Sequence, residues 1–247
     1  MARTIDINCD LGEGCGNDAQ LMRFISSANI ACGYHAGDAD TMARTVELAI
    51  ENAVAIGAHP SYADRDNFGR TEMSLAQNEV FDIVSQQIFT LRRVCNMVGA
   101  ALHHVKPHGA LYNQAAKNAE LSAVIAKAVA ETDDSLILYG LSGSHLITEA
   151  ENIGLNTASE VFADRTYQSD GTLTPRSRPG ALITDADASV SQVFQMIEEQ
   201  SVTSTSGKTV PLRAETICLH GDGEHAISFA SKIRAALTEK GLEIRAI

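Results

Sequence analysis

The chain has 247 residues, 45% of them hydrophobic, which is enough apolar material to bury a substantial core in a single domain. Its 19 basic and 31 acidic residues give a net charge of -12, which argues against nucleic acid and anionic membrane surfaces as partners. We find no signal-peptide pattern, no apolar run of about 20 residues and no C-x-x-C pair among the five cysteines, so we expect a cytoplasmic protein with reduced thiols.

Short apolar segments alternate with segments of helical periodicity, a pattern that predicts βα units and a parallel sheet. We expect strands, in chain order, at residues 4–8, 27–31, 54–57, 102–106, 136–139, 157–161, 217–220 and 242–247. Helical stripes occur around residues 40–51, 121–129, 187–198 and 225–238. Ser74 and Gln77 have capping-box spacing, which predicts a helix from there towards Val98. The polar residues 201–209 are expected to form an exposed loop.

This order of elements fits either a doubly wound open sheet or a barrel. Polar residues of functional type follow nearly every expected strand, whereas an open sheet would concentrate them near one switch point. We therefore predict an α/β fold with a single TIM-like (β/α)-barrel domain over residues 1–247.

Four of the eight histidines lie close to a glycine, at or just beyond the end of an expected strand: His35, His59, His108 and His220. The carboxyl ends of the strands of a parallel barrel open at one mouth, so these residues are expected to converge there. A single histidine in such a position is more often structural. Four together favour a functional site.

Carboxylates and cations occupy the same strand ends. Asp6, Asn8 and Asp10 alternate along the first expected strand, which places all three on the pleat face that points into a barrel. Further charged candidates follow the other strands: Glu13, Asp38, Asp64, Arg65, Arg70, Lys106, Glu160, Asp164, Arg165 and Asp222. Two neighbouring pairs, Asp64/Arg65 and Asp164/Arg165, are explained equally well as ion pairs that hold loops.

Other kinds of chemistry remain open at this stage. A metal site assembled from Asp10, His35 or His59 is one option, although H-E-x-x-H is absent and the metal stays unknown. Cys32 and Cys218 are either histidine-activated nucleophiles or, more commonly for such residues, small buried side chains. The sequence contains no G-x-x-x-x-G-K-[ST] phosphate loop, no kinase signature and no G-x-S-x-G elbow.

Six segments between residues 6 and 226 resemble the signatures of the LamB/YcsF family. In order they are DINCDLGEG, SANIACGYHAGD, GAHPSYADRDNFGR, VKPHGALYN, SEVFADRTYQSDGTLTPRSRPGALI and CLHGDGEHA. The resemblance implies a barrel with seven main strands, similar to the glycoside hydrolase/deacetylase superfamily. It also implies a subunit of a hydrolase that opens 5-oxo-L-proline (pyroglutamate) to L-glutamate with cleavage of ATP to ADP and phosphate. ATP, with Mg²⁺, would be a co-substrate, and the B and C subunits would be partners, while a homo-oligomer remains open.

For that reaction we expect Asp10, His35 or His59 to act as general base on water, and Lys106 and His108 to stabilise developing negative charge. Arg70 or Arg165 would hold the substrate carboxylate. The full set of expected substrate-binding residues is Asp6, Asn8, Glu13, Asp38, Arg70, Tyr112, Glu160, Asp164, Arg165, His220 and Asp222. Two alternatives are a metal-dependent deacetylase or amidohydrolase that uses no ATP, and a non-catalytic subunit that binds the lactam.

Overall fold

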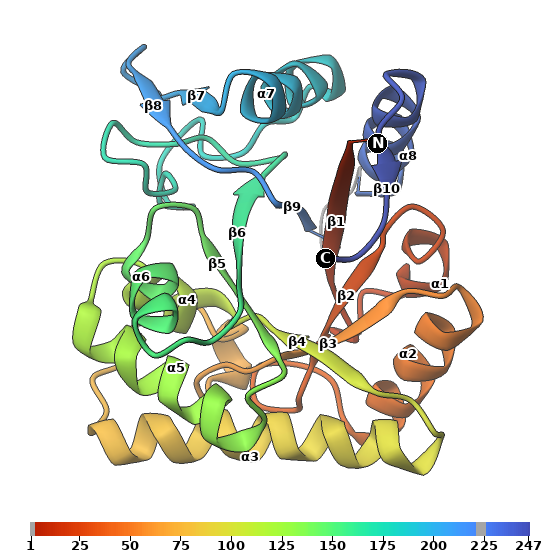
Figure 1. The fold of residues 1–247 in the computed structure, drawn as a ribbon, viewed down its shortest axis with the longest axis vertical. Coiled ribbons are helices and arrows are strands. Elements are labelled where there is room, and N and C mark those ends of the chain that lie inside the picture. Colours follow the sequence, from red (N-terminus) through yellow and green to blue (C-terminus); the bar gives the residue numbers. More distant parts are fainter. Residues whose placement is uncertain (1–2, 221–225) are drawn as a thin grey trace.

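Seven parallel strands form a closed barrel in the structure, a computed structural model that describes residues 3–220 and 226–247 (Figure 1). The barrel strands are β1 (Thr4–Leu11), β2 (Ser27–Ala31), β3 (Ala55–His59), β4 (Leu102–Val105), β5 (Ile137–Leu141), β6 (Thr157–Phe162) and β9 (Thr216–His220). Each pairs with the next, and β9 pairs with both β6 and β1, which closes the sheet. The predicted (β/α) barrel with seven main strands is confirmed.

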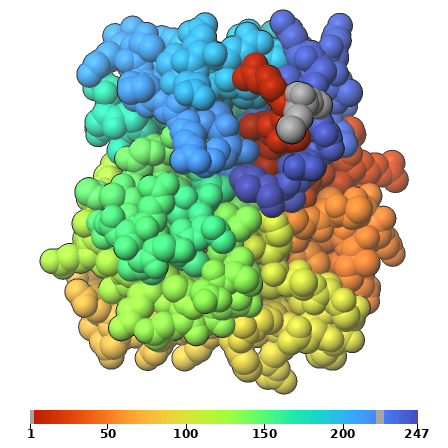
Figure 2. Space-filling model, viewed as in Figure 1, coloured from red at the N-terminus to blue at the C-terminus, as the bar shows by residue number. Residues whose placement is uncertain are grey.

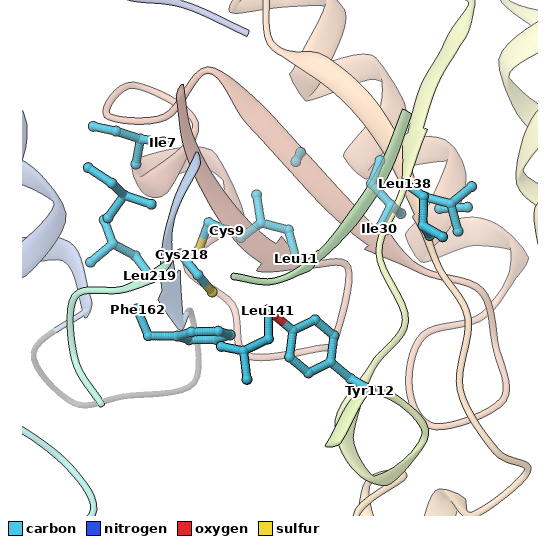
Figure 3. Close-up of a cluster of buried hydrophobic side chains, with 14 of the residues drawn as sticks. Ile7, Cys9, Leu11, Ile30, Tyr112, Leu138, Leu141, Phe162, Cys218 and Leu219 are labelled. Carbon is cyan, nitrogen blue, oxygen red and sulfur yellow. The ribbon is translucent and has the colours of Figure 1, made fainter. Parts of the chain in front are cut away.

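Helices surround the barrel, as Figure 1 shows. They are α1 (Asp18–Leu21), α2 (Ala39–Glu51), the 3-10 helix η1 (Arg65–Asn67), α3 (Gln77–Met97), α4 (Gly109–Ala115), α5 (Ala119–Thr132), α6 (His145–Asn152), α7 (Ala186–Glu198) and α8 (Ala226–Glu239). Their apolar faces pack against the outward-facing side chains of the strands. Ile7, Cys9 and Leu11 of β1 are buried on that outer side, and Figure 3 shows them among a cluster of buried hydrophobic side chains. The main apolar core therefore lies between the barrel and its helices.

Three local predictions need correction. The helix α3 begins at Gln77 and not at Ser74, because the Glu79 carboxylate accepts the Ala76 backbone N–H at 2.8 Å and so sets the first turn. The expected loop 201–209 instead contains a short antiparallel hairpin of β7 (Ser201–Thr203) and β8 (Thr209–Pro211). The expected last strand is only β10 (Glu243–Ile244), which pairs with the start of β1.

The pairing of β10 with β1 brings the two ends of the described chain together. In Figure 2 the last residues, in dark blue, lie beside the first ones, in red. Among the described residues, no helix has both the length and the hydrophobicity needed to cross a bilayer.

The inside of the barrel is polar, unlike the branched apolar layers that usually fill TIM barrels. At the end of the barrel where the strands begin, the Asp6 carboxylate accepts hydrogen bonds from four hydroxyls, those of Ser26, Ser27, Tyr139 and Thr216. Burial is the largest effect on the pKa of Asp6 and raises it, although these hydrogen bonds act in the opposite direction.

The next layer of side chains inside the barrel, closer to the carboxyl ends of the strands, depends on a glycine. The His104 ring donates to the Asn29 side chain at 2.8 Å and stacks on Tyr139, with 4.2 Å between ring centroids. A Cβ atom at Gly57 would lie 2.0 Å from His104 Nε2. Glycine at this point of β3 therefore gives the histidine its place inside the barrel.

Candidate active site

The carboxyl ends of the strands surround a cavity of about 590 Å³. Eight residues singled out from the sequence line it: Asp10, His59, Arg70, Lys106, His108, Tyr112, Arg165 and His220. They come from segments spread over most of the chain, and the parallel barrel brings them together. The expected convergence at one mouth is thus present in the structure.

A buried ion-pair network lies at the floor of this cavity, which its members Asp10 and Lys106 line. The Lys106 ammonium lies 2.9 Å from Asp10 Oδ1 and 2.8 Å from Glu160 Oε1, and all three side chains are almost fully buried. Although burial by itself lowers the pKa of Lys106, the carboxylates of Asp10 and Glu160 raise it well above its ordinary value. Burial likewise tends to raise the pKa of Asp10, but His59 and Lys106 hold it well below the usual range. Lys106 and Asp10 are therefore both charged around neutral pH.

Neighbouring polar groups complete this network. Lys106 Nζ also contacts Asn8 Oδ1 at 3.2 Å, and the Asn29 amide donates to Asp10 Oδ1 at 2.8 Å. The Tyr112 hydroxyl donates to Glu160 Oε2 at 2.6 Å, and burial together with this carboxylate raises the pKa of Tyr112 well above its ordinary value. Tyr112 is therefore a neutral hydrogen-bond donor that orients Glu160.

Two histidines face each other at the edge of the network. His59 Nδ1 donates to the Lys106 carbonyl at 2.7 Å, and His108 Nε2 donates to the Phe68 carbonyl at 2.9 Å. Their other ring nitrogens, His59 Nε2 and His108 Nδ1, lie 2.8 Å apart. His59 Nε2 is also 3.3 Å from Asp10 Oδ2, which links the histidines to the carboxylate.

A third histidine and a carboxylate lie behind this pair. The His35 ring stacks on that of His108 with 3.9 Å between centroids, and His35 Nε2 is 3.3 Å from Glu13 Oε1. Burial is the main cause that lowers the pKa of His35 to about 3. Within the described part of the chain His35 Nδ1 has no hydrogen-bond partner. His35 and Glu13 do not line the cavity and support the histidines that do.

The loop between β3 and α3 holds these rings in place. Asp64 closes the loop by accepting from the Asn67 side chain at 2.7 Å and from the Thr71 backbone N–H at 3.0 Å. Phe68 then adopts the left-handed conformation with φ of 57°, which is uncommon for a residue with a side chain. This turn points the Phe68 carbonyl at His108 and places its ring edge-on to His35 and His108.

The two Asp-Arg pairs do not form the loop-holding ion pairs that the sequence allowed. Arg65 donates to the Gly33 carbonyl, while Asp164 binds His220 Nδ1 at 2.8 Å. Arg165 donates to the carbonyls of Thr174 and Ala181, and burial lowers its pKa to about 10. The guanidinium of Arg165 is therefore occupied by the backbone, although its side chain reaches the cavity wall.

Some expected site residues have other positions. Asp38 caps α2 by accepting from the Thr41 backbone N–H at 2.8 Å, at an exposed position that does not line the cavity. Asp6 and Asn8 lie deeper in the barrel, below the cavity floor, where Asn8 donates to Thr216. Asp222 falls outside the described residues.

Neither candidate cysteine has the environment of a nucleophile. Burial raises the pKa of Cys32 to about 12, and it raises that of Cys218 well above the ordinary value. Cys218 Sγ lies 3.0 Å from Lys106 Nζ, near Phe162 in Figure 3. Both thiols are neutral and serve as small buried groups.

Three important residues were missed by sequence reasoning. Asn29 bridges Asn8 and Asp10, and its alternation with Ser27 and Ala31 in SANIA was the available signal. His104 lies inside an expected strand and not at its end, and it was not singled out. Arg176 lines the cavity, and its position within the family-like segment TLTPRSRPG was the only indication.

The fold and the cavity define a (β/α)-barrel protein with a cavity at the carboxyl ends of its strands, which is the position that barrel enzymes use for their active sites. The chain belongs to the LamB/YcsF family, whose model matches residues 5–247. It is 52% identical to a 5-oxoprolinase subunit from Tolumonas auensis, in an alignment that covers 98% of this chain and 99% of that protein.

Solved structures of similar proteins have the same fold. The lactam utilization protein from Thermus thermophilus superposes with a TM-score of 0.92 at 40% identity, covering 99% of this chain and all of that one. A family 4 carbohydrate esterase from Streptomyces lividans, solved with acetate, superposes with a TM-score of 0.51 at 13% identity over 97% of this chain and 90% of that one. At so low an identity, the second likeness concerns the fold alone.

Proposed function

We propose that this chain is a subunit of an ATP-dependent 5-oxoprolinase, which hydrolyses 5-oxo-L-proline to L-glutamate while ATP is cleaved to ADP and phosphate. The observation that carries the proposal is the 52% identity to the Tolumonas 5-oxoprolinase subunit over almost the whole of both chains. The name of the Thermus relative, a lactam utilization protein, points to the same class of substrate.

The cavity suits a small anionic lactam. A pyroglutamate ring is compact and carries one carboxylate, and the cavity wall contains the guanidinium groups of Arg70 and Arg176. Arginine binds carboxylates through two parallel hydrogen bonds. Arg165 donates to backbone carbonyls, and we assign the substrate carboxylate to Arg70 and Arg176, which line the cavity.

Opening a lactam is difficult because resonance protects the carbonyl and the released amine can close the ring again. Transfer of a phosphoryl group from ATP to the lactam oxygen makes the ring carbon electrophilic. Water then attacks this carbon, the ring nitrogen leaves as the amine, and a second water cleaves the resulting acyl phosphate to glutamate and phosphate. We assign Asp10 as the group that accepts the proton from water, because its Oδ1 is held by Lys106 and Asn29 while Oδ2 faces His59. Such a role contributes about 10² to 10⁴ in rate.

Lys106 and Tyr112 have complementary roles in this scheme. The Lys106 ammonium stabilises the negative charge that develops on the former carbonyl oxygen or on the phosphate. Tyr112 keeps Glu160 oriented, and Glu160 in turn keeps Lys106 charged. No phosphate-binding loop occurs in the sequence, so we assign phosphoryl transfer mainly to the B and C partner subunits.

The test uses the assembly reconstituted with its B and C subunits. Asp10→Asn should lower kcat by about 10² to 10⁴ while the dissociation constant for 5-oxoproline, measured by calorimetry, changes little. Asp134→Asn, at an exposed position, is the matched control. If binding and turnover fall in parallel, the chain is a binding subunit. If the isolated chain turns over ATP with 5-oxoproline as fast as the assembly, the assignment of phosphoryl transfer to the partners is wrong.

A further inference from the structure

Four potential metal ligands converge at the wall of the cavity, from four successive strand ends. Glu13 Oε1 lies 3.3 Å from His35 Nε2, 4.0 Å from His59 Nε2 and 3.5 Å from His108 Nδ1. One ligand atom from each of these residues can be chosen so that all four lie within 4.8 Å of one another. A tetrahedral zinc ion with bonds of about 2.0 to 2.2 Å needs ligand atoms roughly 3.3 to 3.6 Å apart.

The hydrogen bonds of two rings leave their lone pairs facing inward. A carbonyl oxygen only accepts, so the N–H groups of His59 Nδ1 and His108 Nε2 must point at the carbonyls of Lys106 and Phe68. In the neutral rings, His59 Nε2 and His108 Nδ1 then carry bare lone pairs, only 2.8 Å apart. Two lone pairs at this distance repel each other unless a proton or a cation lies between them.

Proteins usually orient a metal-binding histidine through a hydrogen bond from the ring nitrogen that does not bind the metal. A backbone carbonyl that accepts from the second nitrogen fixes the tautomer and the ring plane before the metal arrives. In this chain it occurs at two of the three histidines, and the Phe68 carbonyl that does so is presented by a residue in a left-handed conformation. The loop therefore accepts an uncommon backbone conformation at the point that orients His108.

The local charge also favours a cation. Glu13 is itself a member of the cluster and the Asp10 carboxylate lies 3.3 Å from His59 Nε2, while Lys106 supplies one positive charge to Asp10. The negative charge that remains attracts a cation, and a buried carboxylate needs such a partner.

We propose that Glu13, His35, His59 and His108 bind one divalent first-row metal ion, with zinc as the best match to three imidazoles and a carboxylate. The ion would lie against the cavity floor through His59 and His108, next to Asp10 Oδ2. Binding would widen the gap between His59 Nε2 and His108 Nδ1 from 2.8 Å by roughly half an ångström to reach a tetrahedral edge. This proposal stands independently of the lactam reaction, since it concerns only the ligand set.

A second possible group, Asp10, Cys218 and His220, is the weaker candidate. The Lys106 ammonium lies 3.0 Å from Cys218 Sγ and 2.9 Å from Asp10 Oδ1. A buried positive charge in contact with two of the three ligands repels a metal ion. The two groups share no residue, so variants distinguish them.

The test is metal binding to the full chain. After treatment with a chelator, the protein is titrated with Zn²⁺ by calorimetry and with Co²⁺ by visible absorption, which reports tetrahedral coordination. We expect one ion per chain. Loss of an outer hydrogen-bond partner typically costs 10- to 100-fold in affinity, so His35→Ala and Glu13→Gln should each weaken binding by at least about 100-fold. Circular dichroism checks that both variants fold.

The controls make every outcome informative. His145→Ala removes an exposed histidine and should leave affinity and stoichiometry unchanged. Loss of binding in His220→Ala with normal binding in His35→Ala would place the ion in the other group and overturn the proposal. So would a wild-type protein that binds no ion, or that binds one with the same affinity when either Glu13 or His35 is replaced.

Discussion

Replacing Lys106 with methionine tests whether the buried network holds the barrel mouth together. The change removes the cation that contacts Asp10 at 2.9 Å and Glu160 at 2.8 Å, and methionine keeps most of the side-chain volume. Breaking a buried ion pair by removing one partner costs about 3 to 5 kcal/mol. At about 2 to 4 °C per kcal/mol for a chain of this size, a loss near 4 kcal/mol lowers Tm by roughly 8 to 16 °C.

The pH dependence of this loss has a definite sign. Lys106 is one of the groups that hold the pKa of Asp10 down against burial, so the pair stabilises the fold above the unfolded pKa of about 3.9. That contribution disappears as the pH falls through the lower folded pKa. In Lys106→Met the Asp10 carboxyl is free to take up a proton. The difference in the free energy of unfolding between the variant and the wild type should therefore be large at pH 7.5 and shrink towards pH 4.

The assay is urea unfolding followed by circular dichroism at several pH values. Lys127→Met is the matched control, because Lys127 forms an exposed pair with Glu131 at 3.7 Å and such pairs contribute only about 0.3 to 0.5 kcal/mol. The network is not charged and buried if the free energy of unfolding of Lys106→Met at pH 7.5 is within about 1 kcal/mol of the wild-type value, or if the difference between the two does not change with pH.

Three further variants test other parts of the structure. Gly57→Ala should destabilise the protein by about 1 to 3 kcal/mol, because its Cβ would lie 2.0 Å from His104 Nε2. In the double variant with His104→Ala the two losses of stability should not add. Additive losses would contradict the clash. For Asp6, burial raises the folded pKa, so its stabilising effect is complete below the unfolded pKa of about 3.9 and is lost as the pH rises through the folded pKa. The stability of the wild type relative to Asp6→Asn should therefore fall from pH 4 towards neutrality in urea titrations, whereas parallel curves would count against a raised pKa. Asp38→Ala should leave 5-oxoproline binding unchanged, since Asp38 caps α2; weaker binding in calorimetry would restore it as a site residue.

The barrel was predictable because its signal is local and repeated. Each strand is a short apolar run followed by a polar end, and the alternation of Asp6, Asn8 and Asp10 marks the inner face of β1. The hairpin of β7 and β8 was not recognised, because its few Ser and Thr residues look like any polar loop. Pairing between Val202 and Val210 makes it a hairpin, and composition alone did not reveal it.

The sequence predicted most members of the site but not the contacts among them. Parallel topology explains why His59, Lys106 and His108 meet, since each follows a strand of the same barrel. Their partners depend on distances that sequence spacing does not contain. Asp164 was expected beside Arg165 and instead binds His220, which lies 56 positions away along the chain.

The most direct test of this account is ATP-coupled release of glutamate from 5-oxoproline by the B and C subunits, assayed with the wild-type chain, with Asp10→Asn, and with no chain added. We predict full activity in the first case and little or none in the other two. Undiminished glutamate release without the chain would contradict the central claim that this cavity is where the lactam is opened.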